Sequence, residues 1–308
     1  MTAAEAGAIA PDTRQRLTEL APGVYALVQL DGTWGLSNAG LVVGRETVVL
    51  VDTFFTERRN AELRKTVLQT ARKSPDLIVN THHHGDHVFG NGWFPEAVIV
   101  SHERTRECMG VIDPGASAGR FTDVDFGEVR PTPADVTFAE GLRLHAGDLT
   151  LDVFYPGLAH CVGNSAIHIP EHSILFAGDL LLKGCTPTFV GGSVAGFLTV
   201  LTTLRALEAE TIVPGHGPVC GPEVIDETER YVRFVQEIAA AEHRAGKAPL
   251  EVAQTADLGE FHGWLDHERI VGNLYRAYAE IDGTGTVDTK AMWRDTTAYL
   301  GRPMRSWA

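Results

Sequence analysis

Cysteine is scarce in this sequence, with only four residues among 308. They are scattered and form no Cys-x-x-Cys pair: Cys108, Cys161, Cys185 and Cys220. This spacing excludes disulfide-stapled scaffolds and cysteine-ligated zinc folds, because both need several closely spaced cysteines. We interpret the four as free thiols and expect a cytoplasmic protein. The first residues also show no basic segment followed by an apolar stretch, so we expect no signal peptide.

Basic residues are also under-represented. The chain has 26 Lys and Arg against 40 Asp and Glu, which gives a formal net charge of −14. We find no Lys/Arg cluster that offsets this excess, and an acidic surface repels phosphate backbones and anionic lipids. No apolar run approaches the roughly 18 residues that a membrane span requires. We therefore expect neither nucleic acid nor membrane as a partner, but a small-molecule substrate, with homo-oligomerisation left open.

Histidine, in contrast, is plentiful, with 13 residues, and it is the commonest metal ligand among protein side chains. One segment reads Thr-His-His-His-Gly-Asp-His and contains a His-x-His-x-Asp-His spacing. Alternate residues after a strand project to one side, so His82 and His84 can hold one metal ion. Asp86 and His87 then turn towards a second ion. A solvated His-rich turn is the competing interpretation, but a short apolar run directly precedes the motif. Imidazole and carboxylate ligands suit Zn, with Fe or Mn as alternatives.

The pattern of apolar residues divides the chain into three parts. Residues 1–22 are a polar, Ala-rich arm that we expect to be mobile and that ends at a Pro-Gly turn signal. Residues 23–221 mix strand-like and helical runs, which favours a layered α/β protein over an all-parallel doubly wound sheet. Residues 222–308 have apolar residues spaced by three and four and are predicted to form a helical extension. Within the central part, the expected strands cover 24–30, 36–43, 47–51, 77–79, 98–100, 136–138, 142–145, 149–154, 166–169, 173–176 and 211–213, and the expected helices cover 57–71 and 194–207.

Three further residues are candidate ligands, each at the end of an expected strand. His160 opens His-Cys-Val-Gly-Asn, Asp179 lies in Phe-Ala-Gly-Asp-Leu, and His216 lies in Val-Pro-Gly-His-Gly. Small residues flank all three, so the backbone can approach a crowded centre. Taken singly, each has an ordinary interpretation as a strand-end residue that caps a loop. Together with the first motif they predict a metal centre, because a zinc ion takes at least three protein ligands.

This ordered set of motifs resembles the metallo-β-lactamase superfamily over residues 23–221. The matching segments are Val51-Asp52-Thr53, His82 to His87, His160 to Asn164, Gly178-Asp179 and Gly215-His216-Gly217. The resemblance implies a four-layer αβ/βα sandwich with metal ions at one edge. It also implies a set of roles: His82, His84 and His160 bind the first ion, Asp86, His87 and His216 bind the second, Asp179 bridges the two, and Asp52 orients a ligand histidine from behind.

The resemblance also implies a reaction. Two zinc ions about 3.5–4 Å apart share a hydroxide at neutral pH, which attacks an electrophilic carbonyl or phosphoryl centre. Asp86 and Asp179 are the candidate catalytic carboxylates, and no Ser or Cys nucleophile is required. Asp179 stands where the zinc β-lactamases have Cys, and it resembles the bridging Asp of glyoxalase II and lactonases. Flavo-diiron oxygen reductases have Glu where His84 stands. β-Lactam hydrolysis and oxygen reduction are therefore disfavoured, as is nucleic-acid processing, which the acidic charge argues against.

Several residues are candidates for lining a substrate pocket. Trp34 lies on an early hairpin that often overhangs the metals in this family, and packing on the sheet is an equal alternative. Asn164 and Lys183 lie close to ligand motifs. Lys183 is followed by Gly-Cys-Thr-Pro rather than by the Gly-Asn element of the zinc β-lactamases, so a role in binding a drug carboxylate is not expected.

The remaining candidates lie outside the ligand motifs. The helical extension supplies further candidates for lining the pocket, because such an appendage forms one wall of the pocket in several family members. These candidates are His262, Trp264 and Tyr275. Core packing is the alternative for each of them. The acidic, Pro-rich segment 110–135 is either a lid or, more simply, a solvated insertion.

The sequence leaves four functional hypotheses. The first is a dinuclear zinc-dependent hydrolase of a small ester, thioester or lactone. The second is a metal-dependent cyclase, or thioesterase-like cyclase, of aromatic polyketide biosynthesis, which the Asn-Thr-His-His-His-Gly-Asp-His segment and the helical tail resemble. The third is a mononuclear iron persulfide dioxygenase, with its iron held by His82, His84 and His160. The fourth, a non-catalytic binding protein, is disfavoured because no ligand position is missing.

Overall fold

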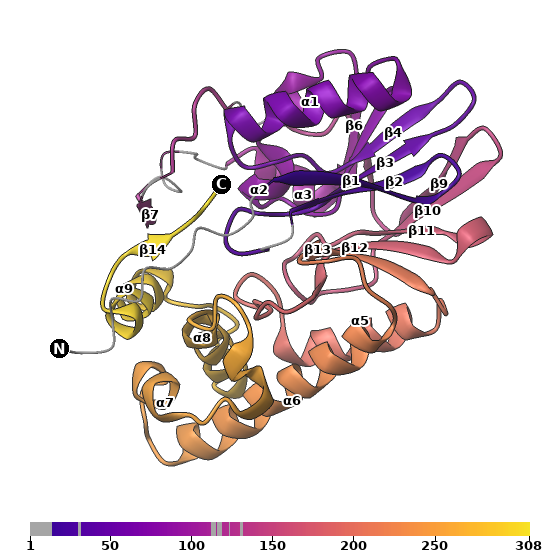
Figure 1. The fold of residues 1–308 in the computed structure, drawn as a ribbon. Helices are drawn as coiled ribbons and strands as arrows, with labels where there is room; N and C mark the ends of the chain where they lie inside the picture. Colours follow the sequence, from indigo (N-terminus) through magenta and orange to yellow (C-terminus); the bar gives the residue numbers. More distant parts are fainter. Residues whose placement is uncertain (1–13, 30–31, 112–114, 116–118, 123, 130–131) are drawn as a thin grey trace.

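The structure is a computed structural model that describes residues 14–29, 32–111, 115, 119–122, 124–129 and 132–308. Two β-sheets lie face to face and helices cover both outer faces, as Figure 1 shows. This confirms the predicted four-layer αβ/βα sandwich with helices at its C-terminal end. The first 13 residues of the expected N-terminal arm lie outside the described residues.

The first sheet has the strand order β1-β2-β3-β4-β5-β6-β8. Its strands are β1 (Gln15–Ala21), β2 (Val24–Gln29), β3 (Ala39–Val43), β4 (Val48–Val51), β5 (Leu77–Asn80), β6 (Val98–His102) and β8 (Val136–Phe138). The first four form an antiparallel meander, and the last four run parallel. Parallel neighbours need a crossover connection, which α1 (Glu57–Ala71) supplies between β4 and β5.

Strand β1 corrects the expected mobile arm. It pairs antiparallel with β2, from Gln15 opposite Gln29 to Ala21 opposite Val24. Residues 15–21 are therefore an edge strand of the first sheet rather than part of an arm. The Pro-Gly pair that follows is the turn of a hairpin, and Gly23 adopts a φ of 78° that glycine tolerates best. The strand was missed because most of its side chains are exposed, so it lacks an alternating apolar pattern.

The second sheet has the strand order β13-β12-β11-β10-β9. Its strands are β9 (Gly141–Ala146), β10 (Leu149–Phe154), β11 (Ala166–Ile169), β12 (Ile174–Leu182) and β13 (Thr211–His216). All nine residues of β12 are buried, as is typical of a strand covered on both faces. β12 and β13 run parallel, with Gly178 opposite Pro214 and Leu182 opposite His216. The pairing brings the carboxyl-end residues of these two strands to the same edge.

Separate apolar cores fill the three spaces between the four layers. The space between the sheets is rich in β-branched residues, which suit a pleated surface; its members include Val24, Val42, Val49, Val79, Ile167, Ile174 and Val213. Helix α1 covers the outer face of the first sheet through Leu63 and Val67. Helices α5 (Val194–Arg205), α6 (Glu223–Arg244) and α8 (Arg269–Ile281) share a third core with the second sheet. The C-terminal helices are thus packed onto the sandwich.

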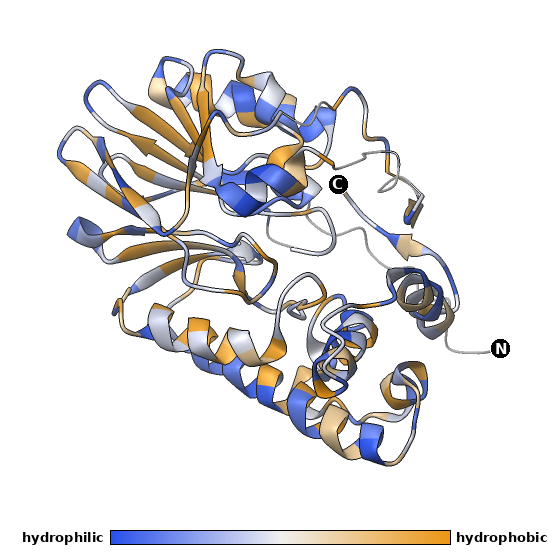
Figure 2. Ribbon diagram, turned by 180° about the vertical axis from the view of Figure 1, so that it is seen from behind, coloured by the Kyte–Doolittle hydropathy of each residue, from blue (hydrophilic) through white to orange (hydrophobic). Residues whose placement is uncertain are grey.

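The remaining helical segments that the structure describes are α2 (Gly85–Val88), η1 (Asn91–Trp93), α3 (Glu103–Met109), η2 (Pro170–His172), α7 (Pro249–Thr255), η3 (Gly259–Gly263) and α9 (Thr289–Leu300). Figure 2 shows hydrophobic residues running through both sheets, while α6 alternates between hydrophobic and hydrophilic stretches. This amphipathic pattern allows α6 to cover the sheet with one face and meet solvent with the other.

The C-terminal tail returns to the first half of the sandwich. Strand β14 (Met304–Arg305) pairs in parallel with β7 (Phe121–Thr122), as Figure 1 also shows. Phe121 and Phe126 anchor the described part of the expected loop 110–135, because their rings lie 5.9 and 4.8 Å from the ring of Phe55. This part of the loop is therefore packed against the sandwich rather than freely solvated.

Candidate metal centre

The seven predicted ligands lie together at one edge of the sandwich. Four of them follow β5, on the turn to α2 and in α2 itself: His82, His84, Asp86 and His87. The other three come from the second sheet: His160 from the loop after β10, Asp179 from β12, and His216 from the end of β13. The strand ends of both sheets thus converge on a single cluster of imidazoles and carboxylates.

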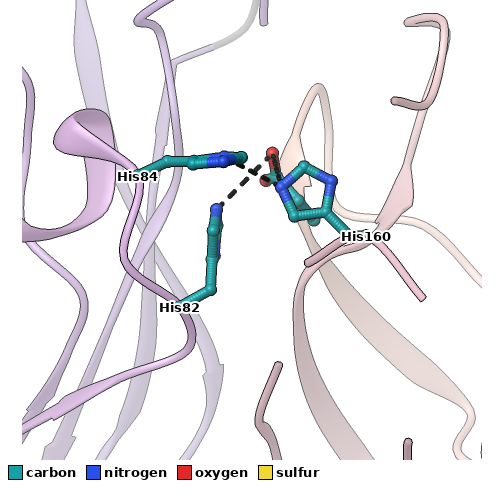
Figure 3. Close-up of side chains that lie close together, drawn as sticks. His82, His84 and His160 are labelled. Carbon is teal, nitrogen blue, oxygen red and sulfur yellow. Dashed lines mark hydrogen bonds and ion pairs between the residues drawn. The ribbon is translucent and has the colours of Figure 1, made fainter. Parts of the chain in front are cut away.

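The first group contains three histidines that point towards one another, as Figure 3 shows. The Nδ1 atom of His84 lies 2.9 Å from the Nε2 atom of His160. The Oδ2 atom of Asp179 lies 3.9 Å from His82 Nε2 and 3.5 Å from His160 Nε2. Three imidazole nitrogens and one carboxylate oxygen therefore surround a single point, which is the donor set of a tetrahedral zinc site.

The second group lies on the other side of Asp179. The Nε2 atom of His216 lies 3.3 Å from Asp86 Oδ2. The Oδ1 atom of Asp179 lies 3.2 Å from His87 Nε2 and 3.5 Å from His216 Nε2. Asp179 thus turns one carboxylate oxygen towards each group.

The donor atoms of this cluster fit divalent cations. In each group, the atoms that could act as ligands lie within 4.8 Å of one another. His82 Nε2, His87 Nε2 and Asp179 Oδ1 are buried and have no hydrogen-bond partner among the described residues. A buried polar atom without a partner costs about 1–3 kcal/mol, and a bound metal ion would remove that cost at His82 Nε2. His87 Nε2 and Asp179 Oδ1 lie 3.2 Å apart, and both could also serve as ligands.

In the first group, the protonation states of the metal-free cluster also suit metal binding. Burial lowers the pKa values of His82 and His84 well below the usual range and lowers that of His160 too. These imidazoles are therefore neutral, as metal ligands must be. Burial raises the pKa of Asp179, but the surrounding histidines outweigh it and hold that pKa well below its usual range. His87 behaves oppositely: burial lowers its pKa, but the neighbouring carboxylates raise it well above the usual range.

Asp52 lies behind His87, where it was predicted to orient a ligand. Its Oδ2 atom lies 2.9 Å from His87 Nδ1 and accepts a hydrogen bond from the Thr81 hydroxyl at 2.7 Å. Its Oδ1 atom accepts a hydrogen bond from the Thr81 backbone N–H, also at 2.7 Å. Asp52 itself adopts a φ of 60°, an uncommon conformation outside glycine that often occurs at functional sites. An acceptor at Nδ1 leaves the Nε2 lone pair of His87 directed at the cluster.

Two glycines allow the backbone to pass close to Asp179. Gly178 adopts a φ of 50°, and a Cβ atom there would lie 2.6 Å from the Thr81 hydroxyl. A Cβ atom at Gly215 would lie 2.0 Å from Asp179 Oδ1. Any larger residue at either position would displace a group of the cluster, so the sequence expectation of small flanking residues has a direct steric reason.

Access to the cluster is from the side of His84 and Asp86, the two ligands that are partly exposed. The Asp86 side chain is 15% exposed, whereas those of His82, His87, His160 and His216 are at most 2% exposed. This is the open side at which a substrate would reach the cluster.

The pocket candidates are spread around the cluster and have varied partners. The Trp34 indole donates a hydrogen bond to Glu268 at 2.8 Å, and the Arg269 guanidinium lies 4.0 Å from its ring. Asn164 is buried and bonds within its own loop, to Gly157 and Cys161. Trp34 therefore links the early hairpin to the C-terminal extension, while Asn164 stabilises the turn after His160.

The side chains of the other candidates have partners outside the cluster or are exposed. The Lys183 ammonium forms ion pairs with Glu223 at 3.3 Å and Glu227 at 2.7 Å, both on α6. Trp264 packs against the rings of Tyr231 and Phe261. His262 is exposed, and the Tyr275 hydroxyl donates to Asp295. The Lys183 backbone N–H donates to the His216 carbonyl at 3.0 Å, but no side chain of these four is joined to a ligand by an interaction between described residues.

Several partners of the ligands were not predicted. Thr81 supports Asp52, and its hydroxyl lies 3.0 Å from His82 Nδ1. The Ser37 hydroxyl donates to the Asp86 carbonyl, and the Thr188 carbonyl accepts from His160 Nδ1. Thr81 could have been found from its place directly before the histidine motif. Ser37 and Thr188 carry no such signal, because their roles depend on tertiary contacts of the backbone.

This fold and this pair of ligand groups define a class of metal-binding αβ/βα sandwich proteins. The sequence model described as the Metallo-beta-lactamase superfamily matches residues 32–216, which is more than half of the chain. The chain belongs to the metallo-β-lactamase superfamily. The structure thereby agrees with the resemblance carried by the five sequence motifs.

Curated relatives include proteins with several activities. A type 2 metallo-beta-lactamase of Bacteroides fragilis is 25% identical over 70% of this chain and 84% of its own. The alpha subunit of a 2,4-dinitroanisole O-demethylase from Nocardioides is 27% identical over 66% of this chain and 56% of its own. A hydroxyacylglutathione hydrolase of Cereibacter sphaeroides is 34% identical over 45% of this chain and 47% of its own. The chain thus spans only about half the length of the last two relatives.

Solved structures support the fold. A metallo-beta-lactamase from Pontibacter korlensis has a TM-score of 0.59 at 21% identity and covers 71% of this chain and 99% of its own. The DIM-1 metallo-beta-lactamase has a TM-score of 0.58 at 19% identity and covers 72% of this chain and 98% of its own. Among the helices that the structure describes, none combines the length and apolarity needed to span a membrane.

Proposed function

We propose that this protein is a dinuclear zinc-dependent hydrolase of a small ester, thioester or lactone. The position of Asp179 carries the proposal, because its two oxygens face two separate groups of buried histidines. One side chain with an oxygen directed at each group is what a bridged pair of ions requires. A single carboxylate shared by both ions would also keep them close enough to act on one substrate.

The seven candidate ligands would be shared between two ions. His82, His84 and His160 would hold one ion, Asp86, His87 and His216 the other, and Asp179 both. When bound, two zinc ions supply a hydroxide nucleophile and polarise the substrate oxygen.

The protein contributes order and orientation at this centre. Burial keeps the three histidines of the first group neutral. Asp52 fixes the ring of His87 from behind. Asp86 lies at the exposed side of the cluster, where its carboxylate would border the bound substrate.

Two observations favour an ester, thioester or lactone as substrate. The 34% identity to a hydroxyacylglutathione hydrolase lies above that to the metallo-beta-lactamase of Bacteroides fragilis, although it covers a shorter part of the chain. Lys183, the cation nearest in sequence to Asp179, is engaged by two glutamates of α6. A cation in such ion pairs is poorly suited to bind a drug carboxylate, which argues against β-lactam hydrolysis.

The test is metal analysis combined with an activity panel. We expect two equivalents of zinc per chain after purification in zinc-containing buffer, and turnover of glutathione thioesters, short acyl esters or lactones. The variant His84→Ala should lose one equivalent and the activity. The variant His83→Gln is the matched control, because His83 neighbours the ligands but belongs to neither group; it should keep both.

Other outcomes would replace this proposal with a different one. A single iron with oxygen consumption would favour the persulfide dioxygenase. Two metal ions without hydrolysis, but with ring closure of an aromatic polyketide chain, would favour the cyclase. A wild-type protein that binds no divalent metal would reject all three enzymes.

A further inference from the structure

The loop 186–189, which follows β12, is hydrogen-bonded both to the metal centre and to the C-terminal extension. Its Thr188 carbonyl accepts a hydrogen bond from His160 Nδ1 at 2.9 Å. This bond places the imidazole proton on Nδ1. It leaves the Nε2 lone pair of His160 facing His84 and Asp179. The position of one loop carbonyl therefore sets both the orientation and the tautomer of a first-group ligand.

The loop is in turn held by the segment 265–273 of the extension. The Thr186 N–H donates to the Leu265 carbonyl at 2.9 Å, and Arg269 Nη1 donates to the Thr186 carbonyl at 2.9 Å. Asn273 makes two bonds: its Nδ2 donates to the Pro187 carbonyl at 2.8 Å, and its Oδ1 accepts from the Phe189 N–H at 3.0 Å. The residues on both sides of Thr188 are thus fixed by side chains of α8.

Arg269 and Asn273 are themselves buried and firmly placed. Arg269 is 4% exposed and Asn273 is fully buried. A second nitrogen of Arg269 donates to Asp266 at 2.8 Å, and Asn273 Nδ2 also contacts the Tyr231 hydroxyl at 3.1 Å. Neither side chain can leave the loop without leaving a buried polar group unpaired. The loop is therefore held in one conformation.

The second ligand group has a different support. His87 is oriented by Asp52, at the end of β4 in the first sheet. No hydrogen bond between described residues joins Asp52 or His87 to residues 265–273. A change in α8 should therefore affect the two groups unequally.

We infer that Arg269 and Asn273 are positioning residues for the first metal site, acting through the Thr188 carbonyl and His160. Both lie beyond residue 216, where the match to the family model ends. The helical extension of this chain is then part of the metal centre rather than only a cover for the sheet. The inference rests on the proposed metal binding.

The experiment measures zinc content and affinity in the full-length protein with Asn273→Ala and Arg269→Lys. Loss of a partner behind a ligand histidine typically weakens metal affinity 10–100-fold. We expect that loss at one site only, so that dialysis against a competing chelator leaves one equivalent where the wild type keeps two. Titration with Co²⁺ should show the same change as the loss of one of two absorption components.

The control is Tyr275→Phe, which removes the 2.6 Å hydrogen bond to Asp295 within the extension but leaves the loop untouched. It should keep two equivalents even if its Tm falls. Asn273→Asp keeps the acceptor for Phe189 but turns a second oxygen towards the Pro187 carbonyl at a fully buried position, so it should weaken the first site at least as much as Asn273→Ala. Arg269→Lys keeps the positive charge beside Asp266 and serves as the folded variant if Asn273→Ala does not fold.

The outcomes separate this inference from the proposed function. Two retained equivalents with unchanged affinity in Asn273→Asp and Arg269→Lys would overturn the inference, as would equal weakening of both sites. A wild-type protein without metal would instead overturn the proposed function.

Discussion

Asp52→Asn is the most informative single change at this centre, because it nearly preserves shape while reversing one hydrogen bond. Asparagine tolerates the positive φ of this position better than most residues, so the backbone should remain as it is. The single side-chain oxygen of the asparagine can still accept the hydrogen bond from the Thr81 backbone N–H. In the variant, an amide NH₂ group takes the place of Oδ2. In the wild type, that oxygen lies 2.9 Å from His87 Nδ1. Two donors would then face each other.

The imidazole can avoid that conflict only by moving its proton. With Nδ1 as acceptor, the proton of His87 lies on Nε2 and points at the second metal position. A buried donor without a partner costs about 1–3 kcal/mol. A 10–100-fold loss of metal affinity, the usual size for such a partner, corresponds to about 1.4–2.8 kcal/mol. The two magnitudes agree, so we expect a loss of 10–100-fold at the second site alone.

The assay is zinc retention against a competing chelator, followed by titration of the metal-free protein. Asp52→Asn should retain one equivalent, and the double variant Asp52→Asn with Asn273→Asp should bind both ions more weakly. That combination identifies which site each substitution affects. The reasoning is refuted if Asp52→Asn binds two zinc ions with wild-type affinity, because a reversed hydrogen bond behind His87 would then have no effect.

Three further changes test other parts of the structure. In Gly215→Ala, the new Cβ would lie 2.0 Å from Asp179 Oδ1; both zinc equivalents should be lost while the far-UV circular dichroism is kept, and normal zinc content would contradict the steric explanation. Met304 is 3% exposed, so Met304→Ala should cost about 2–5 kcal/mol in urea unfolding, and an unchanged midpoint would show that the tail does not contribute. Removal of zinc with a chelator should lower the Tm, because free ligand at 100 times Kd stabilises one site by about 2.7 kcal/mol; an unaltered Tm would mean that metal is not bound by the folded state.

Local signals in the sequence predicted much of the fold. Helix α1 has the bounds expected from its apolar spacing, and strands β8, β10 and β11 also match. The ligand cluster was predictable because its residues sit in short motifs at strand ends. In contrast, the ion pairs of Lys183 join it to residues 40 and 44 positions away. Such contacts depend on how α6 packs, and no local pattern contains that information.

The hydrogen bonds between the loop 186–189 and α8 also affect the order in which the centre can form during synthesis. All seven ligands have left the ribosome once residues just beyond His216 emerge. The support of Thr188 needs a further 57 residues, up to Asn273, which take roughly 3–11 s at 5–20 residues per second. The site of Asp86, His87 and His216 combines residues that follow β5 of the first sheet with the end of β13 of the second. No hydrogen bond between described residues joins these three ligands to α8, so the site can be ordered before then. We therefore expect the growing chain to acquire its second-site ion first and its first-site ion only after α8 has docked.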